Sequence, residues 1–187
     1  MKLHPAQRFT APSTIQRGVP LKELMDRRLV RLISESVSDV LPRFDEKRFK
    51  LRASRGLKNL ELKDRALSIA NAMADQFSSD FAEVAPLLIR SFGPTLNATG
   101  DNGLAPFFYF PHAQLIGNYG VSSFESGMLA NYELTKRFTA EFSVRPFLVE
   151  HRAKSLKLLS QWTQDSNPHV RPLVSEGTRP RLPRSEE

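Results

Sequence analysis

The sequence predicts an all-α protein whose helices stack as an α-α superhelix. Apolar residues recur at three- and four-residue spacing along most of the chain, the period of an amphipathic helix. No segment shows the alternation of apolar and polar residues that a half-buried strand requires. The connections between helical patterns are short, so successive helices form pairs that bury their faces against neighbouring pairs. We expect about eight to ten helices in such an array.

The helical patterns follow one another with recognisable start and stop signals. Asp80 with Glu83, and Ser122 with Glu125, have the spacing of capping boxes. Residues 139–147 are predicted to form a bend, with Pro146 starting the next helix. Helices are expected over residues 21–41, 45–57, 60–77, 80–92, 122–138, 150–164 and 168–177.

The aromatic run Phe107-Phe108-Tyr109-Phe110 is predicted to be buried core. A stacking surface for nucleic-acid bases is the alternative, but clustered aromatic residues ahead of a proline are more often packed inside the protein.

The chain divides into a short arm and one helical domain. Residues 1–20 mix Pro, Gln, Thr, Ser and Arg without periodicity, which predicts a flexible N-terminal arm. Residues 21–184 are long enough for one well-buried domain and too short for two. We therefore expect a single helical repeat domain over residues 21–184.

Composition excludes several classes of protein. The chain has no cysteine, which rules out disulfides and thiol chemistry and agrees with a reducing cytoplasm. There is no apolar run long enough for a bilayer and no secretory h-region, so we expect a cytoplasmic protein with no membrane partner.

The net charge is +7, and residues 136–184 hold ten Lys and Arg against four Asp and Glu. Such a basic segment attracts phosphate backbones, although a solvated surface without a partner has the same composition.

Common catalytic and cofactor motifs are absent. The four histidines are too widely spaced for a helical metal pair. The glycines of residues 94–104 follow no strand and precede no Gly-Lys-Ser/Thr, so a phosphate-binding loop is not supported. We expect no metal and no cofactor.

The C-terminal third has the outline of a HEAT-type helical hairpin. Ala153, Leu156, Leu159 and Trp162 are predicted to form the apolar stripe of its first helix. The turn that follows reads Asp-x-Asn-Pro over residues 165–168. Asp and Asn side chains accept hydrogen bonds from free backbone N–H groups, and proline suits a first helical turn.

The residues after this hairpin carry a more specific signal. Residues 175–183 read SEGTRPRLP, and residues 135–148 read TKRFTAEFSVRPFL. With weaker matches at residues 60–63, 92–94 and 124–125, this pattern resembles the HEAT-like AlkC family of alkylpurine DNA glycosylases. The resemblance extends back to about residue 21. Because family members are longer, we expect the chain to stop partway through the repeat array.

The resemblance implies a function in DNA alkylation repair. Family members excise cationic methylated bases, chiefly 3-methyladenine, in base excision repair. The implied partner is double-stranded DNA containing alkylated bases, bound by a monomer. The resemblance also implies excision without the base flipping that is usual for glycosylases.

The resemblance places two catalytic carboxylates on this chain, Glu141 and Glu176. A base alkylated at N3 is positively charged, and cleavage of its bond to the sugar builds positive charge on the sugar, so a carboxylate in a water-excluded site stabilises both. The alternatives are structural: Glu176 forms an i,i+3 ion pair with Arg179, and Glu141 is a carboxylate favoured at a helix N-terminus.

The basic residues of the same motifs are predicted to contact the DNA backbone. Their neutralisation should lower the salt dependence of binding by about one unit per lost contact. The predicted set is Lys136, Arg137, Arg171, Arg179 and Arg181.

Two positions depart from the family pattern. Pro172 stands where family members have an arginine, which removes a phosphate contact and places a proline inside a short helix. Arg184 stands where they have a tryptophan, so a cation replaces an aromatic face that would attract a cationic base. We therefore expect weak or absent excision of 3-methyladenine. A non-catalytic helical repeat that binds DNA or another protein is the alternative.

Overall fold

The computed structural model describes residues 2–96 and 102–179, and over these ranges all regular structure is helical. This confirms the predicted all-α class. None of these helices has the length and apolar composition needed to cross a membrane. The α-helices are α1 (Pro5–Arg8), α2 (Arg27–Ser38), α3 (Glu46–Ser54), α4 (Leu62–Ala74), α5 (Phe81–Arg90), α6 (Phe110–Tyr119), α7 (Phe124–Thr135), α8 (Glu141–Glu150), α9 (Arg152–Trp162) and α10 (Val170–Gly177). Short 3-10 helices cover Leu21–Leu24, Leu57–Asn59 and Ala105–Tyr109.

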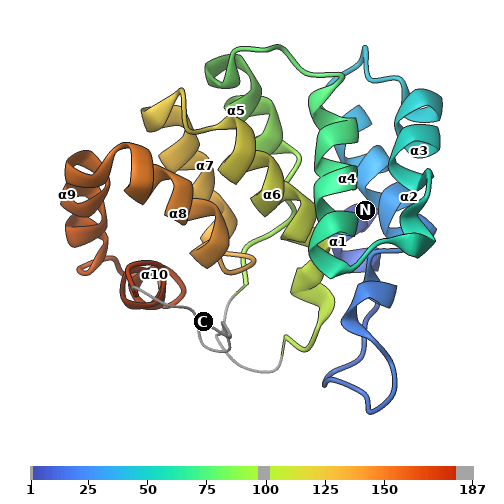
Figure 1. The fold of residues 1–187 in the computed structure, drawn as a ribbon, viewed down its shortest axis with the longest axis horizontal. Coiled ribbons are helices and arrows are strands. Elements are labelled where there is room, and N and C mark those ends of the chain that lie inside the picture. The colour runs from blue at the N-terminus through green and yellow to red at the C-terminus, as the bar shows by residue number, and fades with distance from the viewer. Residues whose placement is uncertain (1, 97–101, 180–187) are drawn as a thin grey trace.

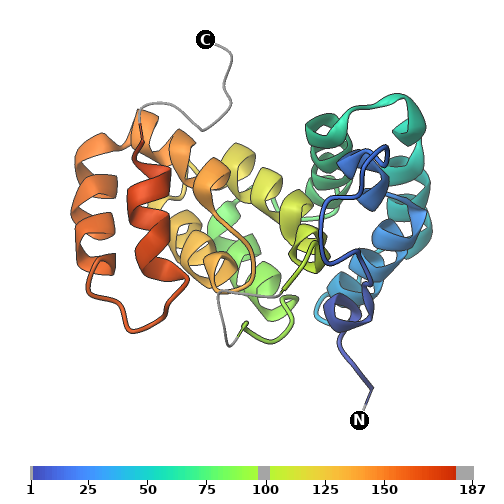
Figure 2. The ribbon, with the colours of Figure 1, turned by 90° about the horizontal axis from the view of Figure 1, so that it is seen from below.

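The helices stack in two rows. In one row α4 packs on α6, α6 on α8 and α8 on α10, while in the other α5 packs on α7 (Figure 1). Helices α2 and α3 close the N-terminal end of the stack, and α9 and α10 close the other end (Figure 2). This is the helical-repeat arrangement that the periodicity predicts, because each pair buries its apolar face against the next. The assignment of individual pairs to HEAT repeats stays a prediction.

The aromatic run lies in the core, as predicted. Phe108, Tyr109 and Phe110 are buried, and Phe107 is half-buried against the core. The rings of Phe108 and Tyr109 meet edge to face with their centroids 5.0 Å apart, a favoured aromatic geometry. The buried rings of Phe108, Tyr109 and Phe110 therefore offer no open stacking surface.

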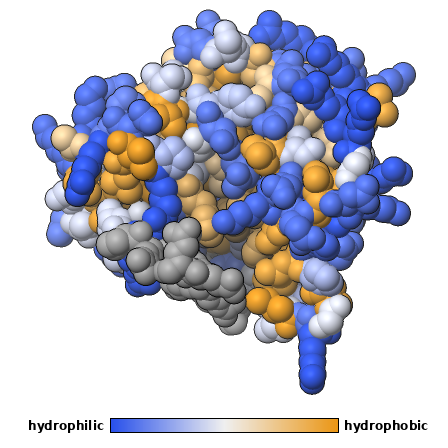
Figure 3. Space-filling view, in the orientation of Figure 1, coloured by the Kyte–Doolittle hydropathy of each residue, from blue (hydrophilic) through white to orange (hydrophobic). Residues whose placement is uncertain are grey.

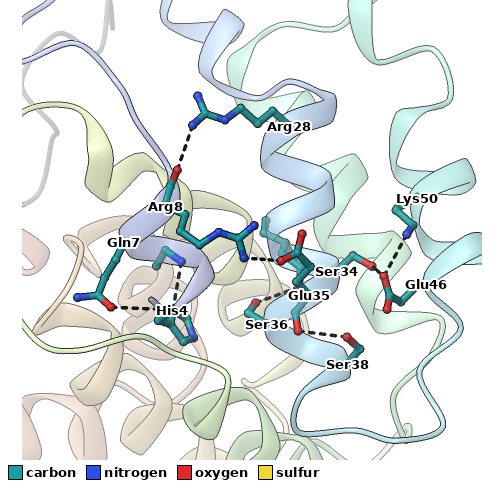
Figure 4. Close-up of polar contacts among 12 residues, drawn as sticks. His4, Gln7, Arg8, Arg28, Ser34, Glu35, Ser36, Ser38, Glu46 and Lys50 are labelled. Carbon is teal, nitrogen blue, oxygen red and sulfur yellow. Dashed lines mark hydrogen bonds and ion pairs between the residues drawn. The ribbon is translucent and has the colours of Figure 1, made fainter. Parts of the chain in front are cut away.

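Part of the predicted N-terminal arm packs on the helical domain. Phe9 is buried in the core, and the Arg8 guanidinium lies 2.5 Å from the Glu35 carboxylate on α2 (Figure 4). Arg28 of α2 donates hydrogen bonds to the Arg8 carbonyl and the Thr10 hydroxyl. Residues 8–10 are therefore held in place by contacts that the composition of the arm does not reveal, while the division of the chain at residue 21 stays a prediction.

The predicted helix over residues 21–41 is interrupted. Residues 21–24 form a 3-10 turn, and α2 begins after Asp26, whose carboxylate accepts a hydrogen bond of 2.8 Å from the Leu29 amide. The Asp26 side chain caps a free backbone amide in the first turn of α2, so α2 begins here and does not include residues 21–24. In α3, Phe49 is buried, whereas Leu51 is 78% exposed and not part of the core. Charged side chains of α3 contribute to the mostly hydrophilic face in Figure 3.

The helix starts in the second half also differ from the predictions. Helix α7 begins after Ser123 rather than Ser122, without a side-chain cap, and ends at Thr135. The predicted bend over residues 139–147 is wrong for most of its length. Helix α8 begins at Glu141 and contains Pro146. Burial of Val144 and Phe147 stabilises this helix and offsets the hydrogen bond that the proline cannot donate.

The apolar stripe predicted for the next helix is half correct. Leu159 and Trp162 are buried in α9, but Ala153 and Leu156 are exposed. The buried face runs instead through Ser155, whose hydroxyl donates a 2.8 Å hydrogen bond to the Phe147 carbonyl of α8. Apolar periodicity does not count serine as a core residue, so the predicted buried face of α9 differs from the observed one.

Gly127 is expected to be intolerant of a side chain. A Cβ there would lie 2.5 Å from the Gly120 carbonyl oxygen and 2.5 Å from two carbons of the Phe147 ring. We expect Gly127→Ala to lower the free energy of unfolding by about 1–3 kcal/mol, because overpacking outweighs the better helix propensity of alanine. Urea denaturation measures the change. Alanine at the exposed helical position Ser160 should be close to neutral, and an equally small effect at Gly127 would contradict the prediction.

Candidate functional site

Helices α8 and α10 bring the two predicted carboxylates into one region. Glu141 is the first residue of α8, and Glu176 is the last residue but one of α10. The two helices pack together, and at Gly177 their approach leaves no room for a side chain, since a Cβ there would lie 2.8 Å from Val144 Cγ1. Glycine next to Glu176 is therefore required by the packing that places α10 against α8.

The two carboxylates influence each other electrostatically. Burial raises the pKa of Glu141 above its usual value, and the negative charge of Glu176 raises it further. The positive charges of Arg145 and Arg179 oppose this shift. Both acids are half-buried, so their interaction is less screened than on an open surface. Two acids and two arginines thus form one charged cluster, which we call the α8–α10 cluster.

Arg145 is the member of this cluster that the sequence reasoning missed. It lies one helical turn after Glu141 on α8, and its Nε and Nη2 atoms are buried without a hydrogen-bond partner in the described part of the chain. Burying guanidinium nitrogens without partners is costly, so the arrangement suits a site that an anion completes. The i,i+4 spacing of Glu141 and Arg145 was the signal that could have identified it.

The turn between α9 and α10 has the predicted chemistry. The Asn167 amide donates to the Asp165 carboxylate at 2.7 Å, and the His169 amide donates to the Asn167 side chain at 2.9 Å. Arg171 donates a 2.7 Å hydrogen bond to the Asp165 carbonyl and so closes the turn from the other side. These bonds fix the direction in which α10 leaves α9, and hence the position of Glu176.

Asp165 is expected to make this turn pH-dependent. The pKa of Asp165 is lowered by the hydrogen bond from the Asn167 amide and by the one from the Tyr132 hydroxyl. The resulting stability is present above the unfolded pKa and is lost as the pH falls through the lower folded pKa. We expect Asp165→Ala to cost up to about 1 kcal/mol at pH 7, since the carboxylate is partly exposed.

Unfolding in urea at a series of pH values tests this expectation. The difference between the native chain and Asp165→Ala should shrink below an ordinary aspartate pKa. Asp165→Asn keeps an acceptor for the Asn167 amide and should depend less on pH. A difference that is constant down to the lowest pH would show that the charge has no part in the turn.

A cavity of about 620 Å³ adjoins Glu176. Its walls come from the end of α7, the start of α10 and the segment before α6. Besides Glu176 they are formed by Ser13, Leu96, Asn102, Gly103, Pro106, Thr135, Arg137, Phe138, Thr139, His169, Pro172 and Leu173. Glu141 does not line it, so the two carboxylates face partly different surroundings. Within residues 2–96 and 102–179, no group of three or more acidic or histidine side chains is placed to hold a metal ion.

A curated protein and a solved structure are similar to this chain. No family model matches the chain. A curated relative, the uncharacterized protein YhaZ of Bacillus subtilis (strain 168), is 32% identical over 165 residues, which are 87% of this chain and 43% of YhaZ. Among solved structures, the Pseudomonas fluorescens alkylpurine DNA glycosylase AlkC, bound to DNA containing an abasic site analog, matches with a TM-score of 0.77 and 30% identity. That match covers 90% of this chain and 45% of AlkC.

The resemblance to AlkC is confirmed. The likeness covers 90% of this chain, and at 30% identity it extends to the sequence as well as to the fold. The chain spans less than half the length of both AlkC and YhaZ. What the complete AlkC protein does is therefore carried over to this chain only as a proposal.

Two of the basic residues expected to bind DNA in this AlkC-like chain have internal partners. Arg137 is 9% exposed and donates to the Gly93 carbonyl at 2.5 Å and to the Glu133 carbonyl at 2.6 Å. Lys136 forms an ion pair with Glu133 at 2.7 Å and lies over the Tyr132 ring. These placements favour a structural role for both side chains over a contact with phosphate.

The other basic residues of the AlkC-like motif are differently placed. Arg171 is exposed beside the α9–α10 turn, and Arg179 is exposed just after α10. No side-chain hydrogen bond or ion pair of Arg179 is formed with the described residues, which leaves its guanidinium available to a phosphate. Arg181 and Arg184 lie outside the described residues.

Pro172 destabilises α10 less than a proline inside a short helix is expected to do. It is the third residue of α10, inside the first turn. The first amides of a helix have no intrahelical acceptor, so a proline there removes no hydrogen bond. The substitution therefore takes away the side chain of the family's arginine without breaking α10.

Proposed function

We propose that this chain binds alkylated double-stranded DNA and excises cationic methylated bases, chiefly 3-methyladenine, in the manner of an AlkC-type glycosylase. The observation that supports this most is the likeness to DNA-bound AlkC over 90% of the chain at 30% identity. It is supported locally by the α8–α10 cluster, where the two carboxylates of the family motif come together. We propose further that the protein acts as a cytoplasmic monomer, without a cofactor and without base flipping.

The chemistry required of the α8–α10 cluster is electrostatic. Water adds to the sugar carbon C1′ as the bond to the cationic base breaks. The bonding electrons leave with the base, which becomes neutral, and the added water loses a proton to the solvent. Positive charge moves to the sugar in the transition state. Glu141 and Glu176 would stabilise that charge, and they are half-buried, which strengthens the interaction. Arg179 would hold a flanking phosphate and so position the sugar.

Release of 3-methyladenine from methylated duplex DNA tests the proposal. The full 187-residue chain, in excess over DNA, should release the base slowly but faster than the same DNA without protein. Unmethylated duplex is the control for release that does not depend on the lesion. No release above the protein-free rate, in the presence of demonstrated DNA binding, would contradict the enzymatic part of the proposal.

A non-catalytic DNA-binding role is the second candidate. It is favoured by Pro172 and Arg184, which replace an arginine and a tryptophan of the family pattern. In that case the chain should bind undamaged duplex with a steep salt dependence and release no base. Absence of binding at low salt would contradict both functions and would favour a protein-interaction role for the helical repeat.

The raised pKa of Glu141 predicts how the rate of excision falls at acidic pH, which we call the acid limb of the pH profile. The ionised carboxylate is the form that stabilises positive charge, so activity should fall as the pH drops through the pKa of Glu141. Burial and Glu176 raise that pKa above the usual 4.5, which moves the loss of activity to a higher pH than an unperturbed glutamate would give. Single-turnover rates as a function of pH measure this limb.

A matched variant identifies the residue responsible. Glu176→Gln removes the neighbouring negative charge and should shift the acid limb of any remaining activity to lower pH. Glu150→Gln, at the exposed far end of the same helix α8, should leave the limb in place. An acid limb that does not move in the Glu176 variant would show that the two carboxylates are not coupled.

A further inference from the structure

Helices α2 and α3 border a groove that gathers four positive charges. The two helices pack on each other at the end of the molecule opposite α8–α10 (Figure 1, Figure 2). The groove between them has a volume of about 520 Å³, and its described walls include no acidic side chain. We call it the α2–α3 basic groove, and its cations are Arg27, Arg31, Lys50 and Arg55.

Three of these four cations have no partner within the described chain. Arg27, Arg31 and Arg55 are exposed, and none of them forms a side-chain hydrogen bond or ion pair with residues 2–96 or 102–179. Lys50 is paired with Glu46 at 3.0 Å. Like charges gathered around one groove repel each other and create a positive potential, so the arrangement favours the binding of an anion.

The surrounding sequence extends this positive charge beyond the groove. Residues 43–58 hold seven Lys and Arg against two Asp and Glu. Within this segment Arg52 forms an ion pair with Asp75, and Lys58 and Arg43 are exposed. The basic surface is therefore wider than one small anion, which indicates a ligand that carries several negative charges.

The apolar residues of α3 decide between two polyanionic partners, a membrane surface and a nucleic acid. A helix that lies in a membrane interface inserts a broad apolar face into the lipid. In α3 only Leu51 is exposed among the apolar side chains, because Phe49 and Ala53 are buried. The arginines of the groove favour phosphate, since a guanidinium donates two parallel hydrogen bonds to its oxygens. These observations favour a nucleic-acid backbone.

We propose that the α2–α3 basic groove binds the phosphate backbone of duplex DNA away from the damaged nucleotide. This inference rests on the proposed function, in which the α8–α10 end of the chain holds the lesion. Helices α3, α4, α6 and α8 pack in succession. Packed helix axes lie about 8–10 Å apart, so the groove is up to about 30 Å from α8, or about nine base pairs of duplex.

The salt dependence of binding to an undamaged duplex tests the proposal, because it needs no lesion and no excision. The duplex should have about 24 base pairs, enough to span both ends of the stack. Replacing Arg27, Arg31 and Arg55 together with glutamine should lower the slope of log K against log salt by about two to three, since each phosphate contact contributes about 0.9. Replacing the same three residues with lysine keeps the charge and should retain most of the slope.

A matched control removes the same charge elsewhere. Arg90, Arg152 and Lys157 are exposed on α5 and α9, and their combined replacement with glutamine should lower the slope by less than about one. Urea denaturation identifies any variant that is not folded, and the lysine variant then decides whether the arginine positions bind DNA through their charge.

Three outcomes would overturn the inference. The first is an unchanged slope in the glutamine variant of the groove, and the second is an equal loss in the control variant. The third is binding to vesicles containing phosphatidylserine that the groove variant loses while its slope for DNA is unchanged. Excision of 3-methyladenine with an unchanged slope would overturn this inference and leave the proposed function intact. A lowered slope without excision would support the groove and contradict the enzymatic function.

Discussion

Replacing Glu176 with glutamine is expected to lower the single-turnover release of 3-methyladenine at least about 100-fold, the usual effect of removing one group that stabilises transition-state charge. Glutamine keeps the size of the side chain and its acceptor oxygen but not the negative charge. Glu176 is half-buried at the end of α10, and its charge reaches Glu141 across the helix contact at Gly177. The loss should therefore appear in the rate and not in the fold.

The experiment needs a background in which the rate is measurable. Pro172→Arg with Arg184→Trp restores the side chains of the family pattern and should raise DNA binding and release above those of the native chain. Glu176→Gln and Glu141→Gln are then compared with Glu150→Gln in both backgrounds. Equal rates for the Glu176 and Glu150 variants would show that the α8–α10 cluster is not the catalytic site.

Replacing Arg137 with methionine is expected to reduce the free energy of unfolding by about 3 kcal/mol, because it leaves buried partners of a charged group unsatisfied. Those partners are the Gly93 carbonyl and the backbone and side chain of Glu133. Methionine retains most of the apolar packing against Phe92, so the loss should report on the hydrogen bonds rather than on a cavity. Urea denaturation at pH 7 measures it.

Arg179→Gln should behave in the opposite way. The side chain is exposed, so the free energy of unfolding should change by no more than about 0.5 kcal/mol. If Arg179 contacts a phosphate, the salt dependence of DNA binding should fall by about one unit. Arg137→Met, studied where the variant is folded, should leave that slope unchanged. A lower slope for Arg137→Met, with stability unaffected, would show that the guanidinium faces DNA after all.

The fold class was predictable because helix formation leaves a local signal. Apolar spacing predicted α4, and the Asp-x-Asn-Pro pattern predicted the turn before α10 together with its hydrogen bonds. Such features depend on residues a few positions apart. The start of α8 at Glu141 was not predicted, because the turn before Pro146 is stabilised by burial of Val144 and Phe147 against other helices.

By itself the sequence determined that the chain is all-helical, and its motifs pointed to Glu141, Glu176 and the resemblance to AlkC. Only the tertiary structure decided which charges belong to the surface. Arg137 and Arg179 look alike in a basic stretch, yet one satisfies buried carbonyls and the other faces solvent. The physical reason is that charge is a property of a residue, whereas burial and hydrogen bonding depend on helices brought together from distant parts of the chain. The cavity beside Glu176 is of the same kind, since residues from 13 to 176 line it.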